Sequence, residues 1–152
     1  MTVINILHII PWHCLGGAVR GMIATAKYSS QLDPTIKHRI LSLKPAVPQA
    51  VKMAEETGIP VIDAPDRATL EQEIQNADIV QVHFWNNPQI YEFLKSDLPE
   101  MRLILWFHVA GEHPPQVITR DLVDYADFAI PCNPHSYELP VFQTLSVEKR
   151  LE

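Results

Sequence analysis

The sequence predicts an α/β domain in which helices cover both faces of a doubly wound, mostly parallel β-sheet. The first reason is residues 3–10, an almost unbroken apolar and β-branched run that is typical of a strand buried on both faces. The second is that strand-like and helix-like segments alternate along the chain, which predicts βαβ units. The third is that the 13 prolines lie at segment ends, where they stop helices and strands.

The elements after the first strand follow in a regular order. A helix is expected over residues 17–32, because Met22 and Ala26 recur on one helical face and Asp33–Pro34 ends it. Further strands are expected over residues 38–43, 59–62, 78–83, 103–107 and 127–131. Further helices are expected over residues 47–57, 68–76, 87–96 and 117–125, and from residue 134 onward. With right-handed crossovers, these units form a Rossmann-like sandwich.

The length of 152 residues is that of about one domain. We therefore expect a single Rossmann-like domain over residues 1–146, followed by a tail over residues 147–152. The tail ends in Leu151–Glu152, a pair that is typical of residues added by cloning and also occurs in native sequence. The tail enters no functional argument.

Composition and charge indicate which partners the protein has and in which cellular compartment it occurs. The net charge is −6, and the basic residues are scattered rather than gathered in a stripe, so we expect no nucleic-acid partner. The start of the chain lacks the features of a signal peptide, and no apolar run is long enough to span a bilayer, which together favour a cytoplasmic protein. Cys14 and Cys132 form no CxxC pair, and a disulfide between them stays an open alternative.

The loops that follow the expected strands are rich in polar and aromatic residues. In an open parallel sheet, ligands bind outside the carboxyl ends of the strands, so these loops are the expected site. The candidate ligand-contacting residues are Trp12, His13, His83, Trp85, Asn86, His108 and Glu112. Several histidines at one edge can bind zinc in principle, but the chain lacks an HExxH pattern, and we expect no metal.

A glycine pair opens the first expected helix. Gly16 and Gly17 would let a ligand approach the backbone closely, and free N–H groups at a helix N-terminus attract phosphate. Arg20, one turn further on, would add a positive charge. A tight strand-to-helix turn with nothing bound is the alternative.

Four segments in order resemble the N-terminal half of family 4 (group 1) glycosyltransferases, which have the GT-B fold. The first is ILHIIP leading to LGGAVR, at residues 6–20. The others are DIVQVH at residues 78–83, LWFH at residues 105–108 and YADFAIPCN at residues 125–133. The chain departs from the family pattern at Val19, where glutamate is usual, at Gln81, where histidine is frequent, and at Cys132–Asn133, where serine is usual. These departures do not change the expected fold, but they leave the substrate undefined.

The resemblance implies half of an enzyme. In that family, the N-terminal domain mainly binds the acceptor, and a second Rossmann-like domain binds the nucleotide-sugar donor. The sequence stops before a second such domain, so we expect the full-length protein to be a glycosyltransferase and this chain to be inactive alone. The implied partners are a nucleotide-sugar donor, a carbohydrate or lipid-linked acceptor and the missing C-terminal domain. A peripheral membrane contact of the full-length enzyme is compatible with the resemblance.

The resemblance also assigns roles to residues. It implies a retaining transferase for a hexosyl-type sugar that needs neither metal nor cofactor, since the nucleotide-sugar is a substrate. His108 is the expected catalytic residue, and Gly16, Gly17 and Arg20 the expected donor phosphate site. The acceptor or sugar would lie against Trp12, His13, His83, Trp85, Asn86 and Glu112. A non-enzymatic nucleotide- or ligand-binding module is the alternative, because one fold serves many functions. The sequence names neither the sugar, the nucleotide, the acceptor nor the oligomeric state.

Overall fold

The structure is a computed structural model that describes residues 2–146 and 149. Its core is one six-stranded sheet in the order β3-β2-β1-β4-β5-β6, and every pair of neighbouring strands is parallel. The predicted single α/β domain with a doubly wound sheet is therefore confirmed. The predicted tail, apart from Lys149, lies outside the described residues. Within the part of the chain that is described, no helix is long and apolar enough to cross a bilayer.

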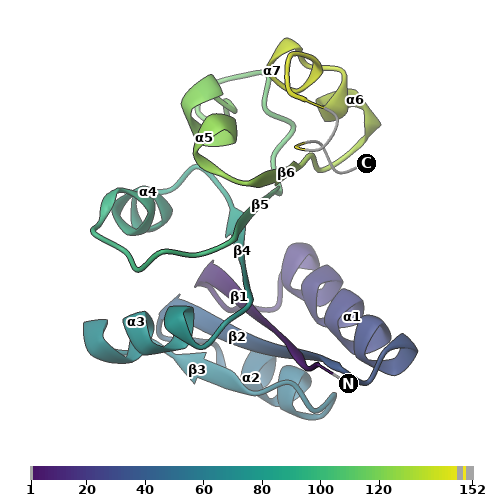
Figure 1. Cartoon of the computed structure of the whole chain (residues 1–152), viewed down its shortest axis with the longest axis vertical. Helices are drawn as coiled ribbons and strands as arrows, with labels where there is room; N and C mark the ends of the chain where they lie inside the picture. The colour runs from purple at the N-terminus through teal and green to yellow at the C-terminus, as the bar shows by residue number, and fades with distance from the viewer. Residues whose placement is uncertain (1, 147–148, 150–152) are drawn as a thin grey trace.

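The predicted elements occur in the predicted order (Figure 1). The strands are β1 (Ile4–Trp12), β2 (Ile36–Lys44), β3 (Val61–Asp63), β4 (Ile79–Phe84), β5 (Leu103–Phe107) and β6 (Phe128–Ile130). The helices are α1 (Gly17–Leu32), α2 (Pro48–Glu55), α3 (Arg67–Gln75), α4 (Pro88–Lys95), α5 (Arg120–Tyr125), α6 (Pro134–Tyr137) and α7 (Pro140–Gln143). Most boundaries lie within two residues of the expected ones, and two differences are larger. Helix α5 begins three residues later than expected, because Val117 forms a β-bridge with Gly111. The single helix expected from residue 134 onward is two short helices, and the second of them begins at Pro140.

The two faces of the sheet bury separate apolar clusters. On one face, residues of β1, β4 and β5 pack against α3, α4, α5 and α7, with Phe84, Phe107 and Phe142 fully buried. On the other face, Ile10 and Ile40 pack against α1 and α2. Alternation along each strand therefore assigns every side chain to one of two differently covered faces.

Two aspartates fix where neighbouring strands begin. A carboxylate oxygen of Asp78, just before β4, accepts a hydrogen bond from the backbone N–H of Asn5 at 2.7 Å. In the same way, Asp127, just before β6, accepts from the backbone N–H of Leu103 at 2.7 Å. Each carboxylate satisfies a donor at the amino end of the adjacent strand, where the ladder supplies no partner.

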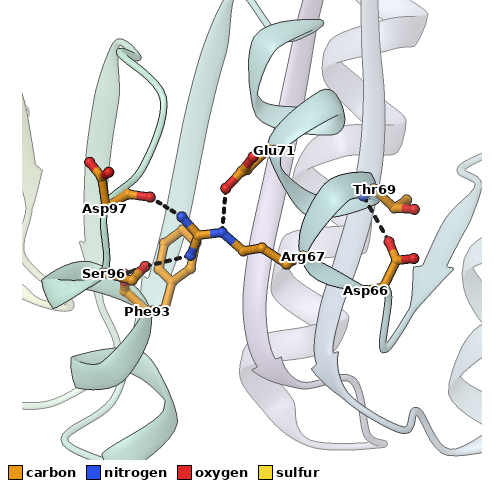
Figure 2. A network of polar contacts seen from close by, with 7 residues as sticks. All are labelled: Asp66, Arg67, Thr69, Glu71, Phe93, Ser96 and Asp97. Atoms are coloured by element: carbon orange, nitrogen blue, oxygen red, sulfur yellow. Dashed lines mark hydrogen bonds and ion pairs between the residues drawn. The ribbon is translucent and has the colours of Figure 1, made fainter.

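An arginine ties α3 to the segment that follows α4 (Figure 2). The Arg67 guanidinium pairs with Glu71 on its own helix and donates to the Asp97 carbonyl and, at 3.1 Å, to the Ser96 hydroxyl. Beside it, Asp66 caps the start of α3 by accepting from the N–H of Thr69. These contacts brace the face of the sheet that α3 and α4 cover.

Replacing Asp127 by alanine should lower the free energy of unfolding by about 1–2 kcal/mol, because the N–H of Leu103 then loses its charged acceptor. Glu92→Ala, on the exposed side of α4, is the matched control and should change stability by less than about 0.5 kcal/mol. Urea unfolding of both variants measures this. Equal losses would show that the Asp127 contact contributes nothing to the fold.

Candidate functional site

A cavity of about 850 Å³ opens at the carboxyl ends of β1, β4 and β5. Six of the residues singled out from the sequence line it: Trp12, Gly16, Gly17, Trp85, Asn86 and His108. Lys44, Gln89, Gln116 and Trp106 also contribute to its wall. Cys14 and Cys132 line it too, and both thiols are free. The cavity therefore lies where the topology of the sheet predicts a ligand site.

The glycine pair leaves open space at the start of α1. Gly16 has an extended backbone with φ −70°, so it has no need of a glycine's conformational freedom. A Cβ atom on Gly17 would meet nothing within 4 Å, and one on Gly16 would meet only Cys14 Sγ at 3.6 Å. No side chain caps this helix, so its first N–H groups stay available to a ligand. Neither packing nor backbone strain demands glycine here.

Aromatic rings form the opposite wall of the cavity. The Trp85 indole stacks on the His108 imidazole with ring centroids 4.6 Å apart and planes at 18°. Trp106 lies against the same imidazole at 5.0 Å. Trp12, half exposed on the other side, donates its indole N–H to the Pro45 carbonyl at 3.1 Å. Packing on two indoles restricts the orientation of the His108 ring.

His108 is also the end of a row of four hydrogen-bonded imidazoles. His108 Nε2 lies 2.8 Å from His83 Nδ1, and His83 Nε2 lies 3.0 Å from His8 Nδ1. His8 Nε2 lies 2.9 Å from His38 Nδ1, and His38 Nε2 lies 2.7 Å from the hydroxyl of Ser29 on α1. We call His38, His8, His83 and His108 the histidine chain. It crosses the sheet from α1 to the cavity.

The register of the sheet explains this alignment. His38 on β2 lies opposite Ile6 on β1, and Ile6 is two residues before His8. His8 pairs with Gln81, two residues before His83, and His83 pairs with Trp106, two residues before His108. Each step to the next strand thus advances by two residues, which keeps all four side chains on one face and forms a diagonal toward the carboxyl edge.

Burial keeps the histidine chain uncharged. It lowers the pKa of His8 to about 3, and the neighbouring His38 adds to the effect. It likewise holds the pKa of His83 well below its usual range, with smaller contributions from His8 and His108. Burial also lowers the pKa of His108 to about 4 and shifts the pKa of His38 in the same direction. Near pH 7 each imidazole therefore has one donor and one acceptor nitrogen.

Four of the residues expected to contact a ligand lie elsewhere. His83 is fully buried behind His108, and His13 is buried with its Nε2 atom 3.0 Å from the Ala50 carbonyl. Arg20 is exposed on the first turn of α1 and is not part of the cavity wall. Glu112 pairs with His135 at 2.7 Å beside a neighbouring hollow of about 500 Å³, which shares Trp85, His108 and Gln116 with the main cavity.

Sequence reasoning also missed participants. The expected strands over residues 3–10 and 38–43 contain His8 and His38, and no pattern in the sequence singles out Ser29. A signal was present, since both histidines lie in apolar strands where an unpaired imidazole is costly. Their contacts depend on strand order and register, which no local pattern in the sequence specifies.

The nitrogens of the histidine chain do not converge on one point. His8 and His83 each use both ring nitrogens on two different neighbours, so the four rings form a row rather than a ligand cage. Among residues 2–146 and 149, no group of three or more His, Cys, Asp or Glu side chains is arranged to hold a metal ion. Near pH 7, the neutral imidazole of His108 offers hydrogen bonding to a ligand.

The buried histidines should make the protein sensitive to mild acid. In the unfolded chain, His8 and His83 bind protons near pH 6.5, whereas in the folded protein they stay neutral to much lower pH. Between pH 7.5 and pH 5, the unfolded state therefore gains protons that the folded state does not. The free energy of unfolding should fall by about 2 kcal/mol for each of the two histidines.

Urea unfolding at pH 7.5, 6.5, 5.5 and 5.0 measures this loss. Hydrogen bonds to threonine lower the pKa of Asp33 and Asp66, whose usual value is 3.8, so these groups affect stability below this pH window. Stability that stays level or rises as the pH falls to 5 would show that the buried histidines accept protons in the folded state.

Comparison with known proteins identifies no relative of this chain. No protein-family model matches it, no characterised protein matches it, and no solved structure matches it. What is established is the fold, an α/β domain with one parallel six-stranded sheet. Function has to be argued from the site, because a fold of this kind serves many activities.

Proposed function

We propose that this domain is the acceptor-side half of the interdomain cleft of a glycosyltransferase that uses a nucleotide-sugar donor. The observation that carries the proposal is the cavity at the carboxyl edge, which is lined by the open N-terminus of α1, three tryptophans and His108. A nucleotide-sugar and its acceptor need a place for phosphate, flat apolar surfaces for rings, and polar groups for hydroxyls. The resemblance of four sequence segments to family 4 glycosyltransferases supports the same assignment.

Each part of the cavity has a role in this proposal. The free N–H groups at Gly16 and Gly17 would bind the donor diphosphate and stabilise the charge on the leaving phosphate. Trp12 and Trp85 would contact the acceptor ring. His108 would hydrogen-bond a sugar hydroxyl. The second domain, with the nucleotide-binding residues, would close the cleft from the opposite side.

A ligand-binding module without catalysis is the second candidate. The specific observation in its favour is that no carboxylate is among the described residues that line the cavity. Acid–base chemistry would then fall to His108, whose lowered pKa makes it a hydrogen-bond partner rather than a proton donor near pH 7. Turnover by a longer form of the protein distinguishes the two candidates.

The first test is binding of free nucleotides to the isolated chain. UDP, GDP, UDP-glucose and GDP-mannose are titrated separately and followed by amide NMR. We expect weak binding of at least one of them, with a dissociation constant of roughly 0.1–1 mM and shifts at Gly16, Gly17 and Trp85, since part of the diphosphate site is missing. Gly17→Val, which points a branched side chain into open space, should weaken binding at least fivefold without loss of fold.

The outcomes of this titration separate the candidates. Sub-micromolar binding would show that the domain is a nucleotide receptor in its own right, in favour of the binding module. No shifts at several millimolar nucleotide would remove the donor phosphate assignment. Sugar transfer by the isolated chain, well above background, would contradict the half-enzyme proposal.

The second test is His108→Ala. This change would leave the buried Nδ1 atom of His83 without a partner. We expect a loss of about 1–3 kcal/mol in the free energy of unfolding. His113→Ala changes an exposed histidine of the neighbouring hollow; it is the control and should lose less than about 0.5 kcal/mol.

Ligand binding provides the other half of this test. At a temperature where both variants are fully folded, His108→Ala should weaken nucleotide-sugar or acceptor binding, whereas His113→Ala should not. Lost stability with unchanged binding would make His108 a structural residue and remove it from the proposed site.

A further inference from the structure

The histidine chain has two different ends. At one end, Ser29 lies on α1, and its hydroxyl donates to the Ala26 carbonyl at 3.1 Å. At the other end, His108 lines the cavity, and no described hydrogen bond uses its Nδ1 atom. This nitrogen is also not among the buried atoms that lack a partner, so it is open to solvent or ligand. A row of imidazoles thus connects a partly buried hydroxyl on α1 with a ring nitrogen that has no protein partner, on a residue that lines the cavity.

Only two arrangements of protons satisfy every contact in an uncharged chain. A neutral imidazole has one N–H and one lone pair, and each contact needs one of each. Either every ring has its proton on Nε2, or every ring has it on Nδ1. A mixed arrangement would bring two N–H groups or two lone pairs together at 2.8–3.0 Å inside the protein. The tautomer of one ring therefore dictates the tautomer of the next.

Ser29 selects between the two arrangements. A carbonyl can only accept, so the contact with Ala26 engages the one proton of the Ser29 hydroxyl. The hydroxyl oxygen must then accept from His38 Nε2, which lies 2.7 Å away. With the proton of His38 on Nε2, its Nδ1 atom accepts from His8, and the same order passes through His83 to His108.

We propose that Ser29, His38, His8 and His83 are positioning residues that hold His108 in the Nε2–H form and so present its Nδ1 lone pair to the cavity as a hydrogen-bond acceptor. The ligand group that fits this nitrogen is a donor, such as a sugar hydroxyl or an amine N–H. Trp85 and Trp106 restrict the orientation of the His108 ring, while the histidine chain determines which of its nitrogens has the proton. The inference concerns the free protein and holds whether or not the domain belongs to a glycosyltransferase.

Nitrogen NMR of histidine side chains tests the proposal directly. The protein is labelled with ¹⁵N at both ring nitrogens, and two- and three-bond ¹H–¹⁵N correlations at pH 7.5 report which nitrogen has the proton. For the wild type we expect all four rings to be neutral and to have the proton on Nε2. His108 in the Nδ1–H form, as an even mixture or charged would overturn the proposal.

Ser29→Ala tests the transmission across the sheet. Without the hydroxyl, neither direction is selected at the far end, and the two nitrogen signals of His108 should move toward each other as both tautomers become populated. Ser30→Ala is the matched control, since this neighbouring hydroxyl donates to the Ile36 carbonyl and is not part of the chain. His108 should be unchanged in that control.

Each result of the variant experiment decides the proposal. A shift of His108 in Ser29→Ala and none in Ser30→Ala supports coupling through three intervening imidazoles. An unchanged His108 in both variants, or an equal change in both, would overturn the role of Ser29. A Ser29→Ala protein that fails to fold leaves the wild-type tautomers as the deciding measurement, because these need no variant.

Discussion

The pairing of β1 with both β2 and β4 is the constraint on which the site depends. Because β1 is central, the chain runs outward to β3 on one side and to β6 on the other, and the loops after β1 and β4 separate at the carboxyl edge. Helices fill the faces of the sheet, but they do not fill the edge where the strand order reverses. The cavity follows from this topology before any side chain is specified.

The same pairing determines which polar residues meet. Parallel strands in fixed register bring side chains of one parity onto one face, and a slip of one residue would move His8 to the opposite face. His8 lies between His38 and His83 because β1 lies between β2 and β4. Asp78 helps to fix this register, since its carboxylate binds the backbone N–H of Asn5 near the start of β1. The contact between Asp78 and Asn5 at the amino edge of the sheet thus supports the histidine chain, which ends at His108 on the carboxyl edge.

Sequence reasoning could predict the fold because periodicity and composition carry that information locally. The apolar run at residues 3–10 and the glycine pair Gly16–Gly17 each determine an element without knowledge of the rest of the chain. From the elements, the rule that ligands bind at the carboxyl edge placed Trp12, Trp85 and His108 near one cavity. These inferences need the order of elements along the chain, but not the order of strands in the sheet.

What could not be predicted depends on register and on side-chain direction. His13 follows the first strand, yet it turns inward, where its Nε2 atom meets the Ala50 carbonyl. His83 also lies at the carboxyl end of an expected strand, but the alternation of side chains along β4 buries it behind His108. No local pattern distinguishes an inward from an outward imidazole at a strand end. That distinction requires the neighbouring strand, whose identity comes only from the assembled sheet.

The hydrogen bonds at the two ends of the histidine chain distinguish a purely structural network from one that can bind a ligand. Burying the imidazoles of His38, His8 and His83 is costly unless each polar nitrogen has a partner, and apolar side chains of similar size would avoid that cost. A purely structural network would be closed at both ends. This one is closed at Ser29, whereas at the other end the Nδ1 atom of His108 has no protein partner and the residue lines a cavity of about 850 Å³. The ring nitrogen without a protein partner therefore belongs to the member of the histidine chain that lines the cavity.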